Sequence, residues 1–277
     1  KLEDANYKTT ALENRGAVAE ELVVNTLKMK FDDRFIDKNV LIKKNKEITI
    51  TDIDVLLTYG GKSIIFQVKS KRLTQVSKQG DINSIKKDLH NAFGFAYKKQ
   101  GLEARKVLMG KGRLGKIEGI DHSKIDDVKE CIVVVVTLDF YPALMSQIYS
   151  LVEKDDECQP IGISIFDLQI IVELLKSREQ IIDYFFCRSK LSHQYLAENE
   201  MCLLSFYIQQ GMKPLEQSES YYIDNSFAKD IDFRVNNRHY HDESYAPKAQ
   251  HTRKKIGRNN PCYCLSGLKY KNCHGRV

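Results

Sequence analysis

The stretch from residue 51 to residue 70 constrains the fold of this chain most strongly, because it reads as two apolar strands joined by a two-glycine turn. The run TDIDVLLTY precedes Gly60 and Gly61, and KSIIFQVKS follows them. Adjacent glycines between apolar runs are a strong signal for a tight β-hairpin. We therefore predict two neighbouring antiparallel strands on either side of these glycines.

Further strands and helices are predicted around this hairpin. The run CIVVVV at residues 131–136 is typical of a buried strand, and IGISIFD at 161–167 predicts another strand, followed by a helix. Apolar residues at helical spacing predict a first helix through residues 18–27 and a long helix over 81–109. Because helices follow strands repeatedly, we expect an α/β fold, a mixed sheet flanked by helices.

The chain divides by composition into three parts. Residues 1–210 carry the strand and helix patterns, and we assign them to one α/β domain. Residues 211–256 are poor in aliphatic side chains and rich in Ser, Asn, His and Tyr, which predicts a polar linker or a loosely packed extension. Residues 257–277 form a short cysteine-containing tail, which we take as a third, separate part.

The apolar runs of the chain exclude one class of protein. The longest run, CIVVVV, is far shorter than the roughly 18 apolar residues that a membrane-spanning helix needs. The first residues show no secretory signal pattern. We therefore expect a cytoplasmic protein without a membrane partner.

Charge is distributed unevenly along the chain. Residues 69–116 carry 13 basic against 3 acidic side chains, whereas residues 117–243 carry 11 basic against 23 acidic. From residue 244 onward there are 8 basic residues and no acidic residue. Two basic blocks favour a surface that binds a polyanion such as nucleic acid. The alternative for each block is a solvated, lysine-rich helix face.

Three polar residues stand where the hairpin strands begin and end. Gln67 and Lys69 are two residues apart and share one face of their strand, and Asp54 can point to the same side from the neighbouring strand. Oxygen ligands for a hard divalent cation, next to a lysine, are the groups that metal-assisted phosphodiester cleavage needs. The alternative is that Asp54 caps a strand and Lys69 is an exposed strand-end residue.

These residues also occur in a recognisable order. Gly16 and Glu20 on the first helix, Asp54 on a strand, a glycine turn and then Q-V-K resemble the PD-(D/E)xK nuclease superfamily, over about residues 10–175. Glutamine in place of the usual acid resembles the Mrr-like restriction endonuclease branch. The resemblance implies a restriction-endonuclease-like sheet and a DNA endonuclease that depends on Mg²⁺ or Mn²⁺.

The resemblance also implies a role for each site residue. Asp54 would be the principal metal ligand, Gln67 would offer its side-chain carbonyl, Lys69 would be the catalytic lysine and Glu20 would complete the metal shell or orient a water. Asp52 competes with Asp54, since it lies two residues earlier on the same face. Glu21 competes less well with Glu20, because it faces about 100° away on a helix.

Several residues after the hairpin are candidates for contact with nucleic acid. Lys71, Arg72, Lys98 and Lys99 are placed to touch backbone phosphates, which supplies affinity without sequence information. Gln100 would reach phosphate or metal in related nucleases, and the alternative is a surface glutamine.

The tail carries a second site. GRNNPCYCLSGLKYKNCHG contains Cys262, Cys264, Cys273 and His274, and three thiolates with one imidazole form a complete tetrahedral set for structural Zn²⁺. The whole stretch closely resembles the SEC-C motif, first known from the tail of the bacterial preprotein-translocating ATPase. There the motif binds a protein partner, so the resemblance implies zinc binding and partner docking.

Three functions are consistent with these features. The first is a Mg²⁺-dependent DNA endonuclease of restriction or defence type, with RNA open as an alternative substrate and a homodimer as one oligomeric form. The second is a nucleic-acid-binding module on a degenerate nuclease fold, for which Gln67 is the argument. The third is a zinc-tailed adaptor that docks a protein partner. The set Glu20, Asp54 and Lys69 favours the first.

Overall fold

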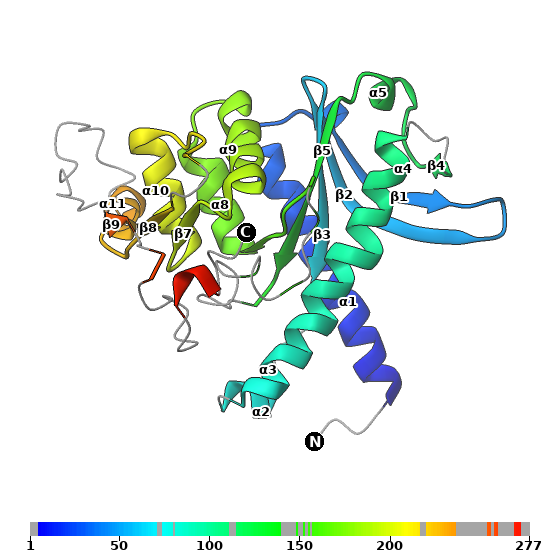
Figure 1. Cartoon of the computed structure of the whole chain (residues 1–277). Coiled ribbons are helices and arrows are strands. Elements are labelled where there is room, and N and C mark those ends of the chain that lie inside the picture. Colours follow the sequence, from blue (N-terminus) through cyan, green and yellow to red (C-terminus); the bar gives the residue numbers. More distant parts are fainter. Residues whose placement is uncertain are drawn as a thin grey trace.

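The computed structural model describes residues 5–70, 74–79, 81–110, 115–139, 148, 152, 155, 157–216, 220–236, 254–255, 258–259 and 269–272. Its centre is a six-stranded mixed sheet with the order β4-β1-β2-β3-β5-β6 (Figure 1). The strands are β1 (Ile36–Lys43), β2 (Thr49–Tyr59), β3 (Lys62–Lys69), β4 (Lys116–Glu118), β5 (Glu130–Thr137) and β6 (Ile161–Ser164). Strands β4, β1, β2 and β3 pair antiparallel, and β3, β5 and β6 pair parallel. The expected α/β class with a mixed sheet is confirmed.

The turn between β2 and β3 forms as its glycines predict. Gly60 and Gly61 have φ angles of 58° and 75°, in the left-handed region that side chains disfavour. Two such residues suit a tight turn whose twist matches the flanking strands. The hairpin therefore places Val55 opposite Phe66 and Leu57 opposite Ile64.

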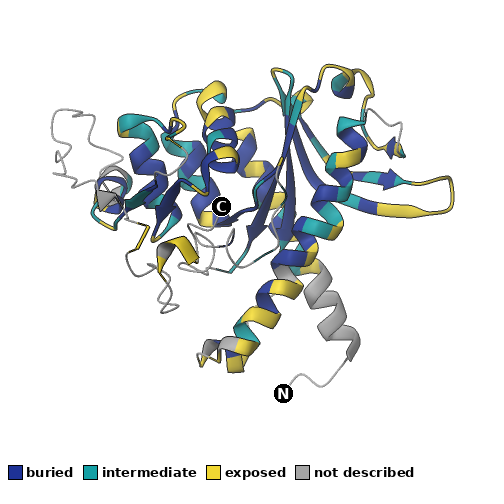
Figure 2. Ribbon diagram, in the orientation of Figure 1, coloured by how far each residue is buried: buried dark blue, intermediate teal, exposed yellow. Residues whose placement is uncertain are grey.

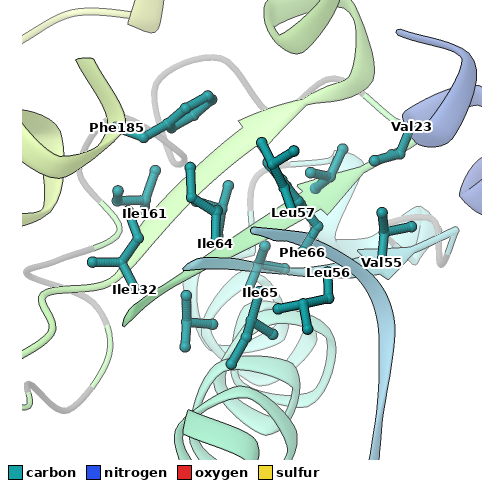
Figure 3. Packing of buried hydrophobic residues seen from close by; sticks show 14 of the residues in the cluster. Val23, Val55, Leu56, Leu57, Ile64, Ile65, Phe66, Ile132, Ile161 and Phe185 are labelled. Carbon is teal, nitrogen blue, oxygen red and sulfur yellow. The ribbon is translucent and has the colours of Figure 1, made fainter. Parts of the chain in front are cut away.

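Helices cover both faces of the sheet. One face packs against α1 (Ala5–Lys28), α8 (Ile165–Leu174) and α9 (Arg178–Leu191), and Phe66 contacts Phe185 edge-to-face with ring centroids 6.0 Å apart. Figure 3 shows Leu57 and Ile64 pointing to the side of Phe185, while Leu56 and Ile65 point to a helix on the other side. Because neighbouring residues of the central strands point to opposite covered faces, these strands are apolar at nearly every position.

One continuous helix covers the second face. It consists of α3 (Ile82–Leu89), two π-helical segments η2 (His90–Gly94) and η3 (Ala96–Leu102), and α4 (Glu103–Met109). This agrees with the helix expected over residues 81–109. Figure 1 shows α1 and α3 both extending past the same edge of the sheet, and Figure 2 shows exposed residues along α3 and at the tip of the β1–β2 hairpin. Short elements complete this region: η1 (Asp33–Phe35), α2 (Gln75–Lys78) and α5 (Ser123–Asp126).

A second, smaller sheet follows in the C-terminal part of the chain. It has the order β7-β8-β9, formed by Tyr195–Ala197, Tyr221–Ile223 and Lys254–Lys255. Helices α10 (Glu200–Gln210) and α11 (Ala228–Asn236) accompany it, and η5 (Tyr270–Asn272) lies in the tail. Buried aromatic and apolar residues around the sheet form a core distinct from the main one, including Tyr195, Phe206, Ile223 and Phe227.

The second core changes the interpretation of residues 211–256. The sequence predicted a linker or a loose extension there, but residues 220–236 include β8 and α11, with Ile223, Phe227 and Ile231 buried. The few large apolar side chains of this segment are buried, which its low aliphatic content did not predict. In the described part of the chain, no helix combines the length and apolar character needed to cross a bilayer.

Candidate functional site

The predicted site lies where β2 and β3 part. Their paired residues end at Val55 and Phe66; beyond this point β2 stays paired with β1, and β3 stays paired with β5. Side chains then bridge the two strands: the Val68 N–H donates to Asp54 Oδ2 at 2.6 Å, and Gln67 Nε2 donates to the Asp52 carbonyl at 2.8 Å. At this end of the two strands, hydrogen bonds of the Asp54 carboxylate and the Gln67 amide therefore take the place of backbone pairing.

Asp54 is a buried carboxylate with a lysine beside it. Only 6% of the residue is exposed, and Lys69 Nζ lies 3.9 Å from its Oδ2. Burial raises the pKa of Asp54 from 3.8 to about 6, against the lowering effects of Lys69 and the Val68 N–H. Asp52 and Glu20 raise this pKa further through their negative charges. The site thus gathers more negative charge than one lysine stabilises, a condition that a bound cation would relieve.

Helix α1 directs Glu20 toward this group and Glu21 away from it. Burial, followed by the charge of Asp52, raises the pKa of Glu20, and the charge of Lys69 lowers it. Glu21 forms an ion pair with Lys38 at 2.9 Å instead, and this contact lowers its pKa. The angular separation expected between neighbouring helix positions is therefore seen in their partners.

Two glutamines converge on Asp52. Gln67 is fully buried, and Gln100 of η3 donates from Nε2 to Asp52 Oδ1 at 3.1 Å. The side-chain oxygens of both glutamines are buried and have no hydrogen-bond partner among the described residues. Buried polar atoms are nearly always paired in native proteins, so an orphaned oxygen at a site needs an explanation. Amide oxygens are ligands for hard cations such as Mg²⁺, and these two fit that role.

The acidic groups alone do not complete a metal site. Across the residues that the structure describes, no three Asp, Glu, His or Cys side chains form a cluster able to hold a metal ion. The Asp52 carboxylate accepts from Gln100 through Oδ1, and Gln67 bonds its backbone carbonyl, whereas Asp54 is the carboxylate that lies beside Lys69. A cation here would rely on amide oxygens and on oxygens supplied by a ligand.

A glycine lets Gln100 reach the site. A Cβ on Gly101 would lie 2.3 Å from Val133 Cγ1, closer than side chains ever approach, so only glycine fits between η3 and β5. The π-helical turns of this segment are a feature that occurs often at functional sites. Sequence reasoning missed this arrangement; the glycine directly after Gln100 was the signal for it.

The other predicted contact residues divide between described and undescribed parts. Lys98 is half-buried and Lys99 is exposed, both in η3 immediately before Gln100. Gln100 itself is half-buried and bonded to Asp52, so it is not a free surface glutamine. Lys71 and Arg72 lie outside the described residues.

The predicted zinc ligands Cys262, Cys264, Cys273 and His274 also lie outside the described residues. Two contacts of the flanking chain are described. Strand β9 pairs Lys255 with Tyr221 of β8, and the Lys271 N–H donates to the Arg258 carbonyl at 2.9 Å. These contacts tie the chain before the motif to the second sheet and connect two parts of the tail. Three thiols and one imidazole remain a donor set that suits Zn²⁺.

Comparison with known proteins identifies the tail. The family model of the SEC-C motif matches residues 258–276. Protein translocase subunit SecA of Borreliella burgdorferi is 82% identical over 22 residues, which cover 8% of this chain and 2% of that protein. SecA of Francisella tularensis subsp. holarctica is 41% identical over 73 residues, which cover 25% of this chain and 7% of that protein. The chain thus spans only a small fraction of these relatives, and no solved structure matches it. Residues 258–276 carry a SEC-C motif, which implies zinc binding, and all four expected ligands fall inside it.

Proposed function

We propose that this chain is a divalent-metal-dependent nuclease with its site at Asp54, Gln67 and Lys69. One observation carries the proposal: the Gln67 side-chain oxygen is buried without a donor, at the strand end that also holds a buried carboxylate and a lysine. Gln159 and Gln210 also have buried, unpaired oxygens, so the weight of the argument lies in the position of Gln67 at the strand end that holds Asp54 and Lys69. An oxygen left free beside Asp54 is explained by a cation that binds there.

Each residue of the site has a role in this proposal. Asp54 and Gln67 would hold Mg²⁺ or Mn²⁺, and the Val68 N–H fixes the orientation of the Asp54 carboxylate. The bound cation would activate a water and polarise the phosphate. Lys69 would donate to the attacking water or to the developing phosphate charge, and Glu20 would orient a water. Asp52 positions the two glutamines.

The expected substrate is DNA, with RNA as the alternative. The basic block over residues 69–116 begins at Lys69, and Lys98 and Lys99 directly precede Gln100. Positive charge next to the metal ligands would bind the substrate through its phosphates. Because the site has few charged ligands of its own, we expect tight metal binding only when phosphate oxygens are present.

The test is cleavage of a supercoiled plasmid with Mg²⁺ or Mn²⁺, with EDTA as the metal-free control. Lys69→Ala should abolish cleavage, and Asp54→Asn should do the same. Lys62→Ala is the matched control, since Lys62 lies at the opposite end of β3 and pairs with Glu130 at 3.7 Å. We expect Lys62→Ala to cleave like the unchanged chain.

The outcomes separate the candidate functions. Metal-dependent cleavage that is lost in Lys69→Ala and kept in Lys62→Ala supports the nuclease. DNA binding at low salt without cleavage points to a degenerate binding module. If the chain neither binds nor cleaves DNA, the nucleic-acid proposal is overturned.

A second candidate is a zinc-tailed adaptor that docks a protein partner, favoured by the SEC-C match at residues 258–276. The paired substitution Cys262→Ser and Cys264→Ser distinguishes it. If the tail docks a partner and the site cleaves nucleic acid, this variant keeps plasmid cleavage. If cleavage is absent in every variant and zinc is bound, the adaptor becomes the better explanation.

A further inference from the structure

One side of the long helix on the second face carries a row of exposed residues that ends at the candidate site. Lys87, Asn91, Phe95 and Lys99 follow one another at intervals of four, and all are exposed. The residues between them that face the sheet are buried, including Leu89, Phe93, Ala96 and Tyr97. Positions four apart lie on one side of a helix. The row therefore forms a continuous strip along one side of the helix.

From Lys87 to Lys99 this strip carries positive charge without exposed acid, and Glu103, the next position of the row, is paired with Lys106 at 2.8 Å. Lys86, Lys87 and Lys99 are exposed, and Asp88 is the only acidic residue between positions 82 and 102. Asp88 is buried and accepts from Ser77 Oγ at 2.6 Å and from the Thr74 N–H at 2.8 Å, so its charge faces α2. A basic strip with its acid turned inward complements a polyanion.

Phe95 distinguishes this strip from an ordinary solvated lysine face. Its exposed fraction is 55%, although neighbouring aromatic residues of the same helix, Phe93 and Tyr97, are fully buried. An exposed ring between lysines offers a stacking surface to any base and supplies affinity without reading sequence. In a duplex the base faces are already stacked on one another, so a free base face is a property of unpaired nucleic acid.

The strip leads into the site. Lys99 is followed directly by Gln100, whose side chain bonds to Asp52, and by Gly101, which packs against Val133. A strand lying along the strip would thus pass from Lys87 toward Asp54 and Lys69.

We propose that the row Lys87, Asn91, Phe95 and Lys99 binds single-stranded nucleic acid and guides it to the candidate site. The inference deepens the proposed nuclease function by naming an unpaired strand as the form of substrate. Lys87 and Lys99 contact phosphates, and Phe95 stacks on a base.

The test measures binding of the full chain to fluorescent oligonucleotides by anisotropy, without added divalent cation. The probes are an oligothymidylate of about 20 nucleotides, longer than a single-strand binding fold usually covers, and a duplex of equal length. Phe95→Ala should weaken oligothymidylate binding about fivefold to 100-fold, in line with the loss of one stacked base. Phe95→Trp should retain binding, and Lys99→Ala should reduce the salt dependence of binding.

Phe166→Ala is the matched control. Phe166 is 58% exposed, similar to Phe95, but it belongs to α8 on the other face of the sheet. We expect this variant to bind like the unchanged chain, and thermal unfolding checks that each variant is folded. Equal losses in Phe95→Ala and Phe166→Ala, or duplex binding that depends on Phe95 as strongly as single-strand binding, overturn the inference.

The two proposals can fail separately. Plasmid cleavage that needs Lys69, together with oligothymidylate binding that ignores Phe95, overturns the guiding strip and leaves the nuclease. Binding that needs Phe95, without cleavage of either the plasmid or the oligothymidylate under any metal condition, overturns the nuclease and supports the strip as a binding surface.

Discussion

Replacing Asp54 by asparagine should stabilise the folded chain at neutral and alkaline pH while abolishing the proposed cleavage. The carboxylate is 6% exposed, and burial raises its pKa from 3.8 to about 6. Asparagine keeps an oxygen that accepts from the Val68 N–H, and it cannot ionise. The substitution therefore removes the free-energy cost of holding a buried negative charge between β2 and β3.

The magnitude follows from the pKa difference between the folded and unfolded states. Because the folded-state pKa is the higher one, the folded chain binds more protons between pH 4 and pH 6, and stability falls as pH rises through this window. The rise of the Asp54 pKa from 3.8 to about 6 corresponds to about 3 kcal/mol of lost stability, fully expressed above pH 6. Lys69 loses its partner in the variant, so about 3 kcal/mol is an upper bound.

Thermal unfolding of both proteins between pH 4 and pH 8 measures this difference. We expect Asp54→Asn to unfold up to about 6 °C higher than the unchanged chain at pH 8, and the gap to close toward pH 4. Mg²⁺ with a short oligonucleotide should raise the unfolding temperature of the unchanged chain and not that of the variant. Functional sites often contain residues that lower the stability of the fold, and a buried carboxylate is one example.

Asp167→Asn is the control, because burial also raises the pKa of Asp167 to about 6 while its carboxylate is held by Ser164 in a helix cap. This variant should keep the response to Mg²⁺. An unfolding temperature of Asp54→Asn equal to or below that of the unchanged chain at pH 8, with no closing of the gap in acid, would refute the reasoning from burial.

Three further predictions follow from other parts of the molecule. Gly101→Ala should cost about 1–3 kcal/mol of stability through overpacking against Val133, and it should impair cleavage by moving Gln100. Gly16→Ala is the control: no atom lies within 4 Å of the new methyl group, so this variant should be neutral or slightly more stable. Thermal unfolding and plasmid cleavage measure both variants. Arg188→Met should lower the free energy of unfolding by about 3–5 kcal/mol in chemical denaturation, because buried Glu200 loses its ion-pair partner at 3.1 Å. Lys38→Met, which breaks the exposed pair with Glu21, should change the free energy of unfolding by less than about 1 kcal/mol. The purified chain should carry one zinc ion by elemental analysis, and Cys262→Ser with Cys264→Ser should lose it; a zinc content unchanged in that variant would contradict the ligand assignment.

The strands and helices that have a clear local sequence pattern were largely predictable. Gly60 and Gly61 predict the hairpin, and the apolar run at residues 131–136 predicts the buried strand, because both patterns depend only on neighbouring residues in the sequence. The fold around residues 220–236 was not, since β8 and α11 are stabilised by contacts with distant aromatic residues and not by a local period.

The candidate site was predictable only in part. The proximity of Asp54 to Lys69 follows from strand alternation and turn position, and the structure places them 3.9 Å apart. The role of Asp52 as the anchor for two glutamines did not follow, because it depends on how the long helix packs on the sheet. That packing is set by the π-helical turns and by the contact of Gly101 with Val133, and neither leaves a periodic signal in the sequence.

The hydrogen bond that crosses the opening between β2 and β3 has a consequence for spectroscopy. The Val68 amide donates directly to Asp54 Oδ2 at 2.6 Å, so the electron density around its proton depends on whether that carboxylate is charged. Its amide resonance should shift with a midpoint near pH 6, following the pKa of Asp54. The Val68 amide thus reports the protonation of Asp54 directly, without substrate and without a label.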